Sequence, residues 1–358
     1  MATETVGLGG AETLILQLSE EMRRRGHTVI PIGPAEDDGW LNQQFLGQGF
    51  PWETYHLDRP IDFPAAERIA AQLRRIRADV IHGHEFVMGV YGAAAGRIAG
   101  VRHIMTMHGN QQMLQKLQRR VALKWAIGRS DATVAVSSAT RDELVTRLRL
   151  AEQTVQVVRN GIPERPGDAT KIRRELGLGQ DELLVLAVGS LMLRKGHRVL
   201  LEAMTLIRQR HPSLRWQVVI AGEGEQRSAL EQYIAENGLA GQARLLGNRN
   251  DVPDLQAAAD VFAMPSLWEG LPLAILEAMF ARTPLIATTA SGIPEAVDDG
   301  EHGLLIPPAD PEALASALLR LLQDPALRER LGEQARARAE TAFSMMAMAD
   351  AYEALYRG

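Results

Sequence analysis

The chain has 358 residues, with 39 Lys and Arg, 44 Asp and Glu and no cysteine, a length that suits two domains better than one hydrophobic core. Apolar residues make up 46% and charged residues 23%, which excludes disorder or a fibrous fold for the bulk of the chain. The absence of cysteine excludes disulfides, Cys-ligated metals and a Cys nucleophile. The net charge of −5 argues against nucleic acid as a partner. No spanning apolar run or signal peptide is visible, so we expect a cytoplasmic protein.

In the first half, short apolar runs alternate with amphipathic segments. Helices are expected at Ala11–Arg25, Pro64–Arg77 and Ala139–Leu150. Strands are expected at His27–Ile32, Val80–His84, His103–Met107, Thr133–Val136 and Val155–Val158. A doubly wound half normally opens with an apolar strand. Only five residues precede Val6, so we expect a first strand that is short or missing.

The pattern breaks at 160–168, where two Gly and two Pro in nine residues indicate a linker. A second alternating series follows. Its strands are expected at Leu183–Val188, Trp216–Ala221, Ala243–Leu246, Val261–Met264, Pro284–Ala287 and Gly303–Ile306. Its helices are expected at His197–Arg210, Gln226–Asn237, Leu273–Arg282, Pro311–Leu322, Ala326–Thr341 and Met345–Tyr356. Such alternation predicts parallel sheets with helices on both faces.

Two glycine-containing loops could bind phosphate. The loop from Gly7 to Glu12 leads into a helix, whose free N–H groups attract an anion. The dinucleotide fingerprint requires glycine where Glu12 stands, so a nicotinamide dehydrogenase is the least supported enzyme class. In the second half, Arg194 and Lys195 follow a strand and suit a diphosphate. The plainer interpretations are a tight turn and two solvated cations.

The segment 264–280 combines a strand end, a loop and a helix start. Pro272 fits the first turn of a helix, which puts Glu269 on the loop at the carboxyl end of a strand and Glu277 inside the helix. That edge of an open α/β sheet is where ligands bind. Two carboxylates there can bind sugar hydroxyls. Solvated glutamates are the alternative, which is weaker for Glu277 because its helix is largely apolar.

Histidines follow two neighbouring strands of the first half. His82, His84 and Glu85 end one strand, and His108 ends the next. A metal site needs a third ligand in fixed geometry, which the sequence does not supply. We therefore favour polar strand-end histidines that line a ligand site, with His108 the best candidate for ligand contact because Gly109 opens space beside it.

The segment 111–129 reads as a basic amphipathic helix. Such a helix could rest on an anionic membrane surface at the inner face or bind a lipid-linked acceptor. An ordinary domain helix with a solvated basic face is the slightly favoured alternative.

Together these motifs resemble the retaining glycosyltransferases of family 4, which have the GT-B fold, and the resemblance covers nearly the whole chain. The matching motifs are Gly9-Gly10-Ala-Glu12, Asp79–His84, Thr106–Gly109, Asn160-Gly161, Arg194-Lys195-Gly196, Ala221–Gly224, Leu246-Gly247, Ala259-Asp260, Pro265-Ser266, the Glu269–Glu277 pair and Gly292–Glu295. The resemblance implies two Rossmann-like doubly wound domains that face an interdomain cleft. Residues 1–162 would bind the acceptor, 163–343 the nucleotide-diphosphate sugar, and the helix 344–358 would cross back to the first domain.

The same resemblance assigns roles to individual residues. Glu269 would contact the donor sugar beside the reacting carbon, and His108 would contact it from the other domain; these are the predicted catalytic residues. The predicted donor-binding residues are Arg194, Lys195 and Gly10 at the diphosphate, Glu277 at the ribose, Asn248 and Arg249 at the base, and Gly270, Leu271 and Leu273, where the N–H groups of the two leucines would face sugar or phosphate oxygens. Two departures are Ser190, where the family commonly has Arg, and Pro272, which lacks an N–H.

The resulting expectation is a retaining enzyme that moves a hexose from a nucleotide-diphosphate sugar to a glycan, glycolipid or small-molecule acceptor, as in polysaccharide synthesis. Family frequency favours a UDP-sugar first and GDP-mannose second. The cationic loop and the helix starts stabilise the leaving diphosphate, so we expect neither a metal nor a cofactor. A sugar-nucleotide epimerase or hydrolase of related fold and a non-catalytic sugar-nucleotide binder stay open as alternatives.

Overall fold

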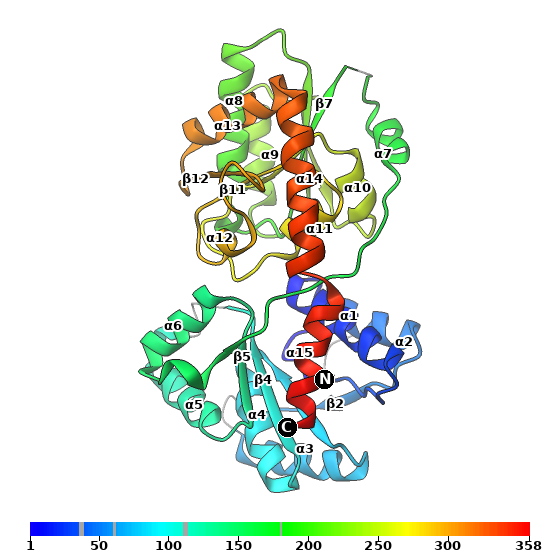
Figure 1. Cartoon of the computed structure of the whole chain (residues 1–358), viewed down its shortest axis with the longest axis vertical. Coiled ribbons are helices and arrows are strands. Elements are labelled where there is room, and N and C mark those ends of the chain that lie inside the picture. Colours follow the sequence, from blue (N-terminus) through cyan, green and yellow to red (C-terminus); the bar gives the residue numbers. More distant parts are fainter. Residues whose placement is uncertain (36–38, 60–61, 110–113, 180) are drawn as a thin grey trace. The chain divides into compact units, whose positions relative to one another are not determined.

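The computed structural model describes residues 1–35, 39–59, 62–109, 114–179 and 181–358 (Figure 1). The chain divides into two compact units. Unit 1 consists of Met1–Ile162 together with Met345–Gly358, and unit 2 is Pro163–Ser344. None of the described helices is both long and apolar enough to cross a bilayer.

Unit 1 alternates strands and helices. Its strands are β1 (Ile32–Pro34), β2 (Glu53–Tyr55), β3 (Val80–His84), β4 (Arg102–Met107), β5 (Ala132–Ala135) and β6 (Gln156–Val157). Its α-helices are α1 (Gly10–Arg24), α2 (Trp40–Gly47), α3 (Phe63–Arg75), α4 (Glu85–Ala99), α5 (Leu117–Ile127), α6 (Ser138–Leu148) and α15 (Met345–Arg357), with a 3-10 turn η2 (Glu152–Thr154). Side chains of Asp62 and Ser137 cap α3 and α6 by accepting bonds from free N–H groups of the first turn.

The strands of unit 1 form two parallel sheets in the orders β1-β2 and β3-β4-β5-β6. Ala2 lies between them as an isolated parallel bridge to Ile32 and to Gly83. The chain therefore runs from the Ala2 position outward to β1 and β2, and then returns to β3 on the other side of Ala2. This reversal makes a topological switch point beside β3, where ligands bind in such sheets.

The predicted strand His27–Ile32 is wrong except for its last residue, because the strand begins at Ile32 and ends at Pro34. The physical reason is the lack of a neighbour. Residues 27–30 line a hollow instead of pairing with an adjacent strand. The helix expected over 111–129 is shorter, since α5 spans Leu117–Ile127, and its predicted start at 111–113 lies outside the described residues.

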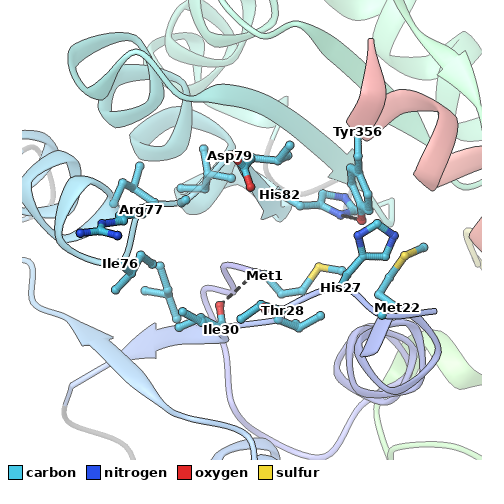
Figure 2. Close-up of a pocket in the computed structure, with 17 residues that line it drawn as sticks. Met1, Met22, His27, Thr28, Ile30, Ile76, Arg77, Asp79, His82 and Tyr356 are labelled. Atoms are coloured by element: carbon cyan, nitrogen blue, oxygen red, sulfur yellow. Dashed lines mark hydrogen bonds between the residues drawn. The ribbon is translucent and has the colours of Figure 1, made fainter. Parts of the chain in front are cut away.

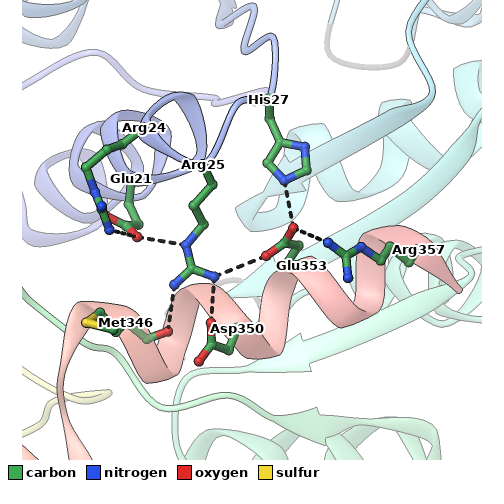
Figure 3. A network of polar contacts seen from close by, with 8 residues as sticks. All are labelled: Glu21, Arg24, Arg25, His27, Met346, Asp350, Glu353 and Arg357. Atoms are coloured by element: carbon green, nitrogen blue, oxygen red, sulfur yellow. Dashed lines mark hydrogen bonds and ion pairs between the residues drawn. The ribbon is translucent and has the colours of Figure 1, made fainter.

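The last helix, α15, packs in unit 1 against α1 through an ionic cluster (Figure 3). The Arg25 guanidinium lies 2.6 Å from Asp350 Oδ1 and 3.1 Å from Glu353 Oε2. It also donates to Glu21 and to the Met346 carbonyl. The side chains of Arg25 and Glu353 are only 15% and 17% exposed, so their contact is largely shielded from solvent and fixes the end of α1 to α15.

Unit 2 holds a longer series. Its strands are β7 (Leu183–Val188), β8 (Trp216–Ala221), β9 (Ala243–Gly247), β10 (Val261–Met264), β11 (Leu285–Thr288) and β12 (Leu304–Ile306). Its helices are α7 (Ala169–Leu176), the 3-10 turn η3 (Leu193–Lys195), α8 (His197–Arg210), α9 (Arg227–Glu236), α10 (Val252–Ala258), α11 (Leu273–Phe280), α12 (Ile293–Ala296), α13 (Pro311–Gln323) and α14 (Pro325–Ala342). The aspartates Asp168, Asp310 and Asp324 cap α7, α13 and α14.

The sheet of unit 2 is fully parallel, in the order β12-β11-β10-β7-β8-β9. Apolar side chains of its strands and of α8, α9 and α13 form one large buried cluster. The chain starts at β7, proceeds outward through β8 and β9, and returns to β10 on the other side of β7. The switch point therefore lies between β7 and β10, and the loops after these two strands frame the expected ligand position.

Candidate functional site

The loops that follow β7 and β10 lie in contact at the switch point of unit 2. The Leu267 N–H donates to the Arg194 carbonyl at 2.8 Å. Gly196 has a φ of +67°, and a Cβ added there would lie 2.0 Å from the Pro265 carbonyl oxygen. Only glycine fits at such a close approach with a left-handed backbone. The close approach of Gly196 to Pro265 therefore holds the loop after β7 against the loop after β10, and Lys195 lies next to the loop that contains Glu269.

The Glu269 carboxylate is the centre of this cluster. Lys195 Nζ donates to its Oε1 at 2.6 Å, and the Ser266 hydroxyl donates to the same oxygen at 2.8 Å. Arg194 lies 3.6 Å from Oε2. The side chains of Glu269 and Lys195 are 6% and 13% exposed, so the pair is largely withdrawn from water. The structure therefore brings together three of the predicted site residues, Arg194, Lys195 and Glu269.

Ser266 was not among the predicted site residues. It is fully buried and follows β10 by two residues, and its carbonyl accepts a hydrogen bond of 2.6 Å from Thr288 of β11. It therefore ties the Glu269 carboxylate to two strands of the sheet. The sequence signal that could have found it is the hydroxyl three residues before the glutamate on the same loop.

The electrostatic balance of the cluster favours an anion. Two cations, Arg194 and Lys195, share one carboxylate. The neighbouring His197 adds no charge near neutral pH, because burial lowers its imidazole pKa to about 4. The N-terminal turn of α8 begins at this histidine and contributes a partial positive charge. The two cations therefore outnumber the one carboxylate, which leaves a net positive charge that a diphosphate could occupy.

Glu277 lies in α11, whose N-cap position is Pro272. Burial raises the pKa of the Glu277 carboxyl to about 7, with Arg165 as an opposing influence. The segment before the helix contains Gly270 and Leu271, both buried, and Leu273 begins the helix. No hydrogen bond or ion pair is seen between Glu277 and Glu269 among the described residues, so the two predicted carboxylates have separate environments on one strand–loop–helix segment.

The loop predicted to frame the base follows β9, two strands away from β7. Asn248 is exposed. Arg249 is bound by two carboxylates, with contacts of 2.6 Å to Glu175 and 2.8 Å to Asp251. Its guanidinium therefore helps to hold α7 against the loop before α10. At about 4.8 Å per strand, Asn248 lies on the same sheet edge as the Lys195 loop, at a distance that an extended ligand could span.

In unit 1, the predicted His108 lies at the carboxyl end of β4 next to the end of β3. His84 Nδ1 and His108 Nε2 are 3.0 Å apart, and the His108 N–H donates to Glu85 Oε1 at 3.2 Å. Burial lowers the pKa of His108 to about 4 and raises that of Glu85 to about 8. Near neutral pH the imidazole is therefore uncharged and the Glu85 carboxyl is mostly protonated, so the cluster is polar with little net charge.

Glu85 was quoted in the sequence but not predicted as a site residue. Its backbone has a φ of +63°, an unusual value for a glutamate. Its Oε2 is buried, with no hydrogen-bond partner among the described residues. A strained backbone and an unpaired buried oxygen next to His108 mark it as part of this site. No sequence pattern predicts the left-handed backbone conformation of Glu85.

His82, the remaining histidine at the end of β3, contacts hydroxyl groups of neighbouring elements. His82 lies 2.8 Å from both the Tyr356 hydroxyl and the Thr106 hydroxyl. Thr106 in turn lies 3.1 Å from the Tyr352 hydroxyl. These contacts link β3 and β4 to α15. Among the described residues, the one group with metal-ligand spacing is Asp298, Glu301 and His302, which includes none of the predicted site residues.

Gly10 is the first residue of α1 and is exposed. The Glu12 carboxylate lies over the helix start, where the Thr5 hydroxyl donates to it and where a Cβ on Gly9 would meet it. A carboxylate at this position repels the phosphate that a nicotinamide dinucleotide would place there. Gly10 and His108 belong to unit 1, and the other predicted site residues belong to unit 2.

On α5, three apolar side chains with a spacing of four residues are exposed. Leu117 is 70%, Val121 62% and Trp125 41% exposed. Lys124 turns toward the end of α6, where it donates to the carbonyl of Leu148. The helix therefore presents an apolar stripe beside basic residues.

Comparison with known proteins places both units in described families. The model of group 1 glycosyl transferases matches residues 168–338, and the model of glycosyltransferase family 4 matches residues 8–165. A D-inositol 3-phosphate glycosyltransferase of Saccharomonospora viridis is 31% identical over 78% of this chain and 70% of its own. An alpha-D-kanosaminyltransferase of Streptomyces kanamyceticus is 29% identical over 79% of each chain. The crystal structure of Anabaena HepE in complex with UDP covers 99% of this chain and 97% of its own, with a TM-score of 0.86 at 22% identity.

Proposed function

Because the chain belongs to glycosyltransferase family 4, we propose that it transfers a hexose from a UDP-sugar to an acceptor hydroxyl with retention at the anomeric carbon. Its two parallel α/β units are the Rossmann-like domains of the GT-B fold, which confirms the predicted fold class. The enzyme is a glycosyltransferase, and its nucleotide-sugar donor is part of the proposal. The retaining course, the hexose, the UDP base and the acceptor are the parts we propose.

The observation that supports this proposal best is the cluster of Lys195, Arg194 and Glu269 at the switch point of unit 2. As the bond from sugar to diphosphate breaks, negative charge develops on the leaving group. Preorganised cations stabilise that charge, an effect worth about 10²–10³ in rate for one removed donor. We therefore propose that Lys195 and Arg194 hold the diphosphate and that the enzyme needs no metal, which a transfer assay in excess EDTA would test.

Retention requires the acceptor hydroxyl to attack from the face that the diphosphate leaves. In the mechanism we propose, an oxygen of the departing phosphate takes the proton of the acceptor hydroxyl. Glu269, held by Lys195 and Ser266, orients the sugar and stabilises the positive charge on its ring. We assign the acceptor to unit 1, with His108 as the residue that contacts the transferred sugar.

For the donor, UDP is the first proposal because HepE, which has the same fold, is described in complexes with UDP and with UDP-glucose. In this assignment Glu277 would bind the ribose and Asn248 would frame the base. GDP-mannose is the second proposal. Arg249 serves less readily for base contact, because Glu175 and Asp251 already bind its guanidinium.

We further propose that α5 contacts an anionic membrane surface at the inner face, which suits a lipid-linked acceptor in polysaccharide synthesis. The support is the exposed stripe of Leu117, Val121 and Trp125, beside basic residues that attract anionic headgroups. Co-sedimentation with vesicles that contain phosphatidylglycerol should fall on the substitutions Leu117→Ser and Val121→Ser. Equal binding of this variant would remove the membrane proposal and leave the transfer proposal intact.

The main test combines nucleotide binding with turnover. UDP should raise the melting temperature more than GDP does, because a ligand that binds only the folded state stabilises it by mass action. UDP-glucose with an acceptor panel should then yield a product whose anomeric configuration matches the donor. Turnover without acceptor would favour an epimerase or hydrolase, and tight donor binding without any product would favour a binder; either result contradicts the transfer proposal.

A further inference from the structure

Four polar side chains share one face of the unit 1 sheet at the carboxyl ends of β3 and β4. His82 and His84 are two residues apart on β3, and Thr106 of β4 is two residues before His108. Alternate residues of a strand point to the same face of a sheet. The register places His84 beside Thr106, so all four side chains lie on the same face. The two strands thereby bring three histidines together.

The rings of His82 and His84 stack on each other. Their centroids are 4.1 Å apart and their planes are inclined by 34°. His84 Nδ1 also lies 3.0 Å from His108 Nε2, and the planes of these two rings are inclined by only 24°. His84 is 2% exposed, so water does not compete at its end of the contact. His84 therefore connects the stack to His108, the residue that we assign to the transferred sugar.

The far end of the stack is held by the last helix. His82 Nδ1 lies 2.8 Å from the Tyr356 hydroxyl of α15, and Figure 2 shows these two side chains beside each other. His82 Nε2 lies 2.8 Å from the Thr106 hydroxyl. Both ring nitrogens are therefore engaged, and rotation of the His82 ring would break both contacts. Through His82 and His84, α15 is connected to His108.

The contact between His84 and His108 joins two uncharged rings. Burial lowers the pKa of His108 to about 4 and holds the pKa of His84 well below its usual range. Both imidazoles are therefore neutral near neutral pH, and each carries one N–H and one bare nitrogen. A hydrogen bond between them needs the proton on one of the two facing nitrogens and a lone pair on the other. The contact therefore has a direction, from one ring to the other.

The direction of this bond fixes both tautomers together. If His84 donates from Nδ1, then His108 Nε2 is bare and His108 carries its proton on Nδ1. If His108 donates from Nε2, then His84 Nδ1 is bare and His84 carries its proton on Nε2. The two rings therefore have the same tautomer, with the proton on Nδ1 in both or on Nε2 in both.

The remaining nitrogens of the pair differ in their access. His84 Nε2 is buried and has no hydrogen-bond partner among the described residues. His108 is half-buried, and within the part of the chain that the structure describes its side chain is bonded through Nε2 and not through Nδ1. Nδ1 is thus the nitrogen of His108 that is left for a ligand. Whether it donates or accepts is set by the bond to His84.

We propose that His84 is a positioning residue that fixes the orientation and the tautomer of His108, and that His82 and Tyr356 hold His84 in place. The inference rests on the proposed function in one point, the contact between His108 and the transferred sugar. A sugar hydroxyl donates or accepts a hydrogen bond, as a serine hydroxyl does, so a fixed tautomer selects one orientation of that hydroxyl. A group that is preorganised in this way costs no reorganisation during the reaction.

The tautomers can be read in the native chain. Nitrogen NMR of protein that contains isotope-labelled histidine shows which ring nitrogen carries the proton, and single substitutions assign the signals of His84 and His108. We expect one tautomer for each ring and the same tautomer in both. Opposite tautomers, or a mixture of tautomers at His108, would overturn the proposal whether or not the enzyme transfers a hexose.

Two substitutions of His84 separate its polar contact from its volume. His84→Leu fills the space without a polar group, whereas His84→Asn keeps an amide that can donate or accept. The leucine variant should lower kcat by about tenfold, the loss expected for one hydrogen bond, and should show both tautomers at His108. The asparagine variant should recover most of kcat and a single tautomer. Equal kcat in the two variants, or one unchanged tautomer at His108 in the leucine variant, would contradict the proposal. The native spectrum still decides the question if the leucine variant does not fold.

A positioning role also requires that these effects depend on His108. When His108→Ala is already present, His84→Leu should cause no further loss of kcat. Tyr356→Phe removes only the hydroxyl at the far end and should lower kcat about threefold in the native chain, again with no effect beside His108→Ala. Tyr233→Phe is the matched control and should leave kcat unchanged, since its hydroxyl contacts Thr205 in unit 2. Equal losses in the native chain and in His108→Ala would overturn the proposal.

The outcomes also separate this inference from the proposed function. If His108→Ala leaves transfer unchanged, the contact between His108 and the sugar is wrong, while matching tautomers in the native spectrum would still show that His84 fixes the ring. If His108→Ala lowers transfer and the tautomers of the two rings differ, the sugar contact stands and the positioning role of His84 is wrong.

Discussion

The Lys195 ammonium lies 2.6 Å from the Glu269 carboxylate in the predicted donor site, with the Ser266 hydroxyl on the same oxygen. The pair joins the loops after β7 and β10, which are 74 residues apart in sequence at these positions. In the proposed mechanism, the diphosphate competes with Glu269 for Lys195, and the carboxylate becomes available to the sugar ring. The pair therefore links donor binding to the positioning of the residue that faces the reaction.

Lys195→Ala should lower the rate of transfer by about 10²–10³, because Arg194 alone is left to stabilise the leaving diphosphate. The measurement is steady-state transfer from UDP-glucose. Arg210→Ala is the control, since it removes an exposed ion pair with Glu312 in the same unit and should leave the rate unchanged. Normal turnover of Lys195→Ala would contradict the assigned role.

Loss of Lys195 should also destabilise the protein more than loss of the whole pair. The single variant leaves the Glu269 carboxylate nearly buried without its closest cation, which costs about 3 kcal/mol in comparable buried pairs. The double variant Lys195→Ala, Glu269→Ala removes this penalty and should recover part of the free energy of unfolding. Denaturant titration of the two single variants and the double variant measures the coupling. If the losses in free energy of unfolding of the two single variants add up to the loss of the double variant, the expected penalty for an unpaired Glu269 carboxylate is contradicted.

Glu277→Gln should change stability in a pH-dependent way. The folded pKa of about 7 lies above the ordinary value of 4.5, so folding favours the protonated carboxyl. The stability due to this group is therefore full below about pH 4.5 and is lost as pH rises through about 7. The variant should melt at a higher temperature than the native chain at pH 8 and at a similar temperature at pH 5.

The same substitution should weaken donor binding by about tenfold, the loss expected for one hydrogen bond to a charged group. Glu85, whose pKa is also raised, is present in both chains and cancels in the comparison of melting temperatures. An identical difference in melting temperature at the two pH values would contradict the burial of Glu277.

His108→Ala should reduce transfer without changing the affinity for UDP itself. The imidazole contacts the sugar in our proposal, whereas the nucleotide binds in unit 2. We expect a loss of about 10²-fold in kcat, as for the removal of one positioned polar group, and an unchanged dissociation constant for UDP by calorimetry.

The same substitution should also change the stability of the protein in acid. Because burial lowers the His108 pKa to about 4, the stability that the neutral imidazole gives is lost as pH falls from about 6.5 to 4. The variant should therefore resist acid better than the native chain.

Arg25→Ala should loosen α15 from α1. The guanidinium binds carboxylates of both helices, and its loss should cost about 2 kcal/mol and lower the melting temperature by several degrees. Arg357→Ala is the matched control, since its side chain is 75% exposed and contacts the same Glu353. Arg25 is also the largest influence that lowers the pKa of Glu353, so the difference between native chain and variant should shrink as pH falls below the ordinary pKa of a glutamate.

The sequence predicted the parts of the fold that depend on local periodicity. β3, β7, β8 and β10 have the bounds expected. β7, β8 and β10 are mainly apolar runs between polar turns, whereas β3 begins with two apolar residues and ends with histidines. Periodicity placed Lys195 and Glu269 on loops that follow two strands, and the resemblance to the family assigned both residues to the donor site; that the two strands are neighbours in the sheet was known only from the structure. The roles assigned to these residues stay predictions until the variants are measured.

The features that the sequence could not predict depend on distant partners. The segment 27–30 has a strand-like composition but lacks a neighbour to pair with. Arg249 resembles a free cation in the sequence, yet it is bound by Glu175, which lies 74 residues away. Glu85 adopts a left-handed backbone that no propensity predicts. Short elements such as β2 and α2 form on tertiary contacts, with little periodicity of their own.

The position of α15 has a consequence for the order in which the protein matures. This helix belongs to unit 1 but is translated after all of unit 2. A nascent chain released up to Ser344 would leave Arg25, His82 and Thr106 without their contacts to α15, while unit 2 could already be complete. The N-terminal unit is thus the last to finish folding, and a ribosome that stops early yields a product with one mature half.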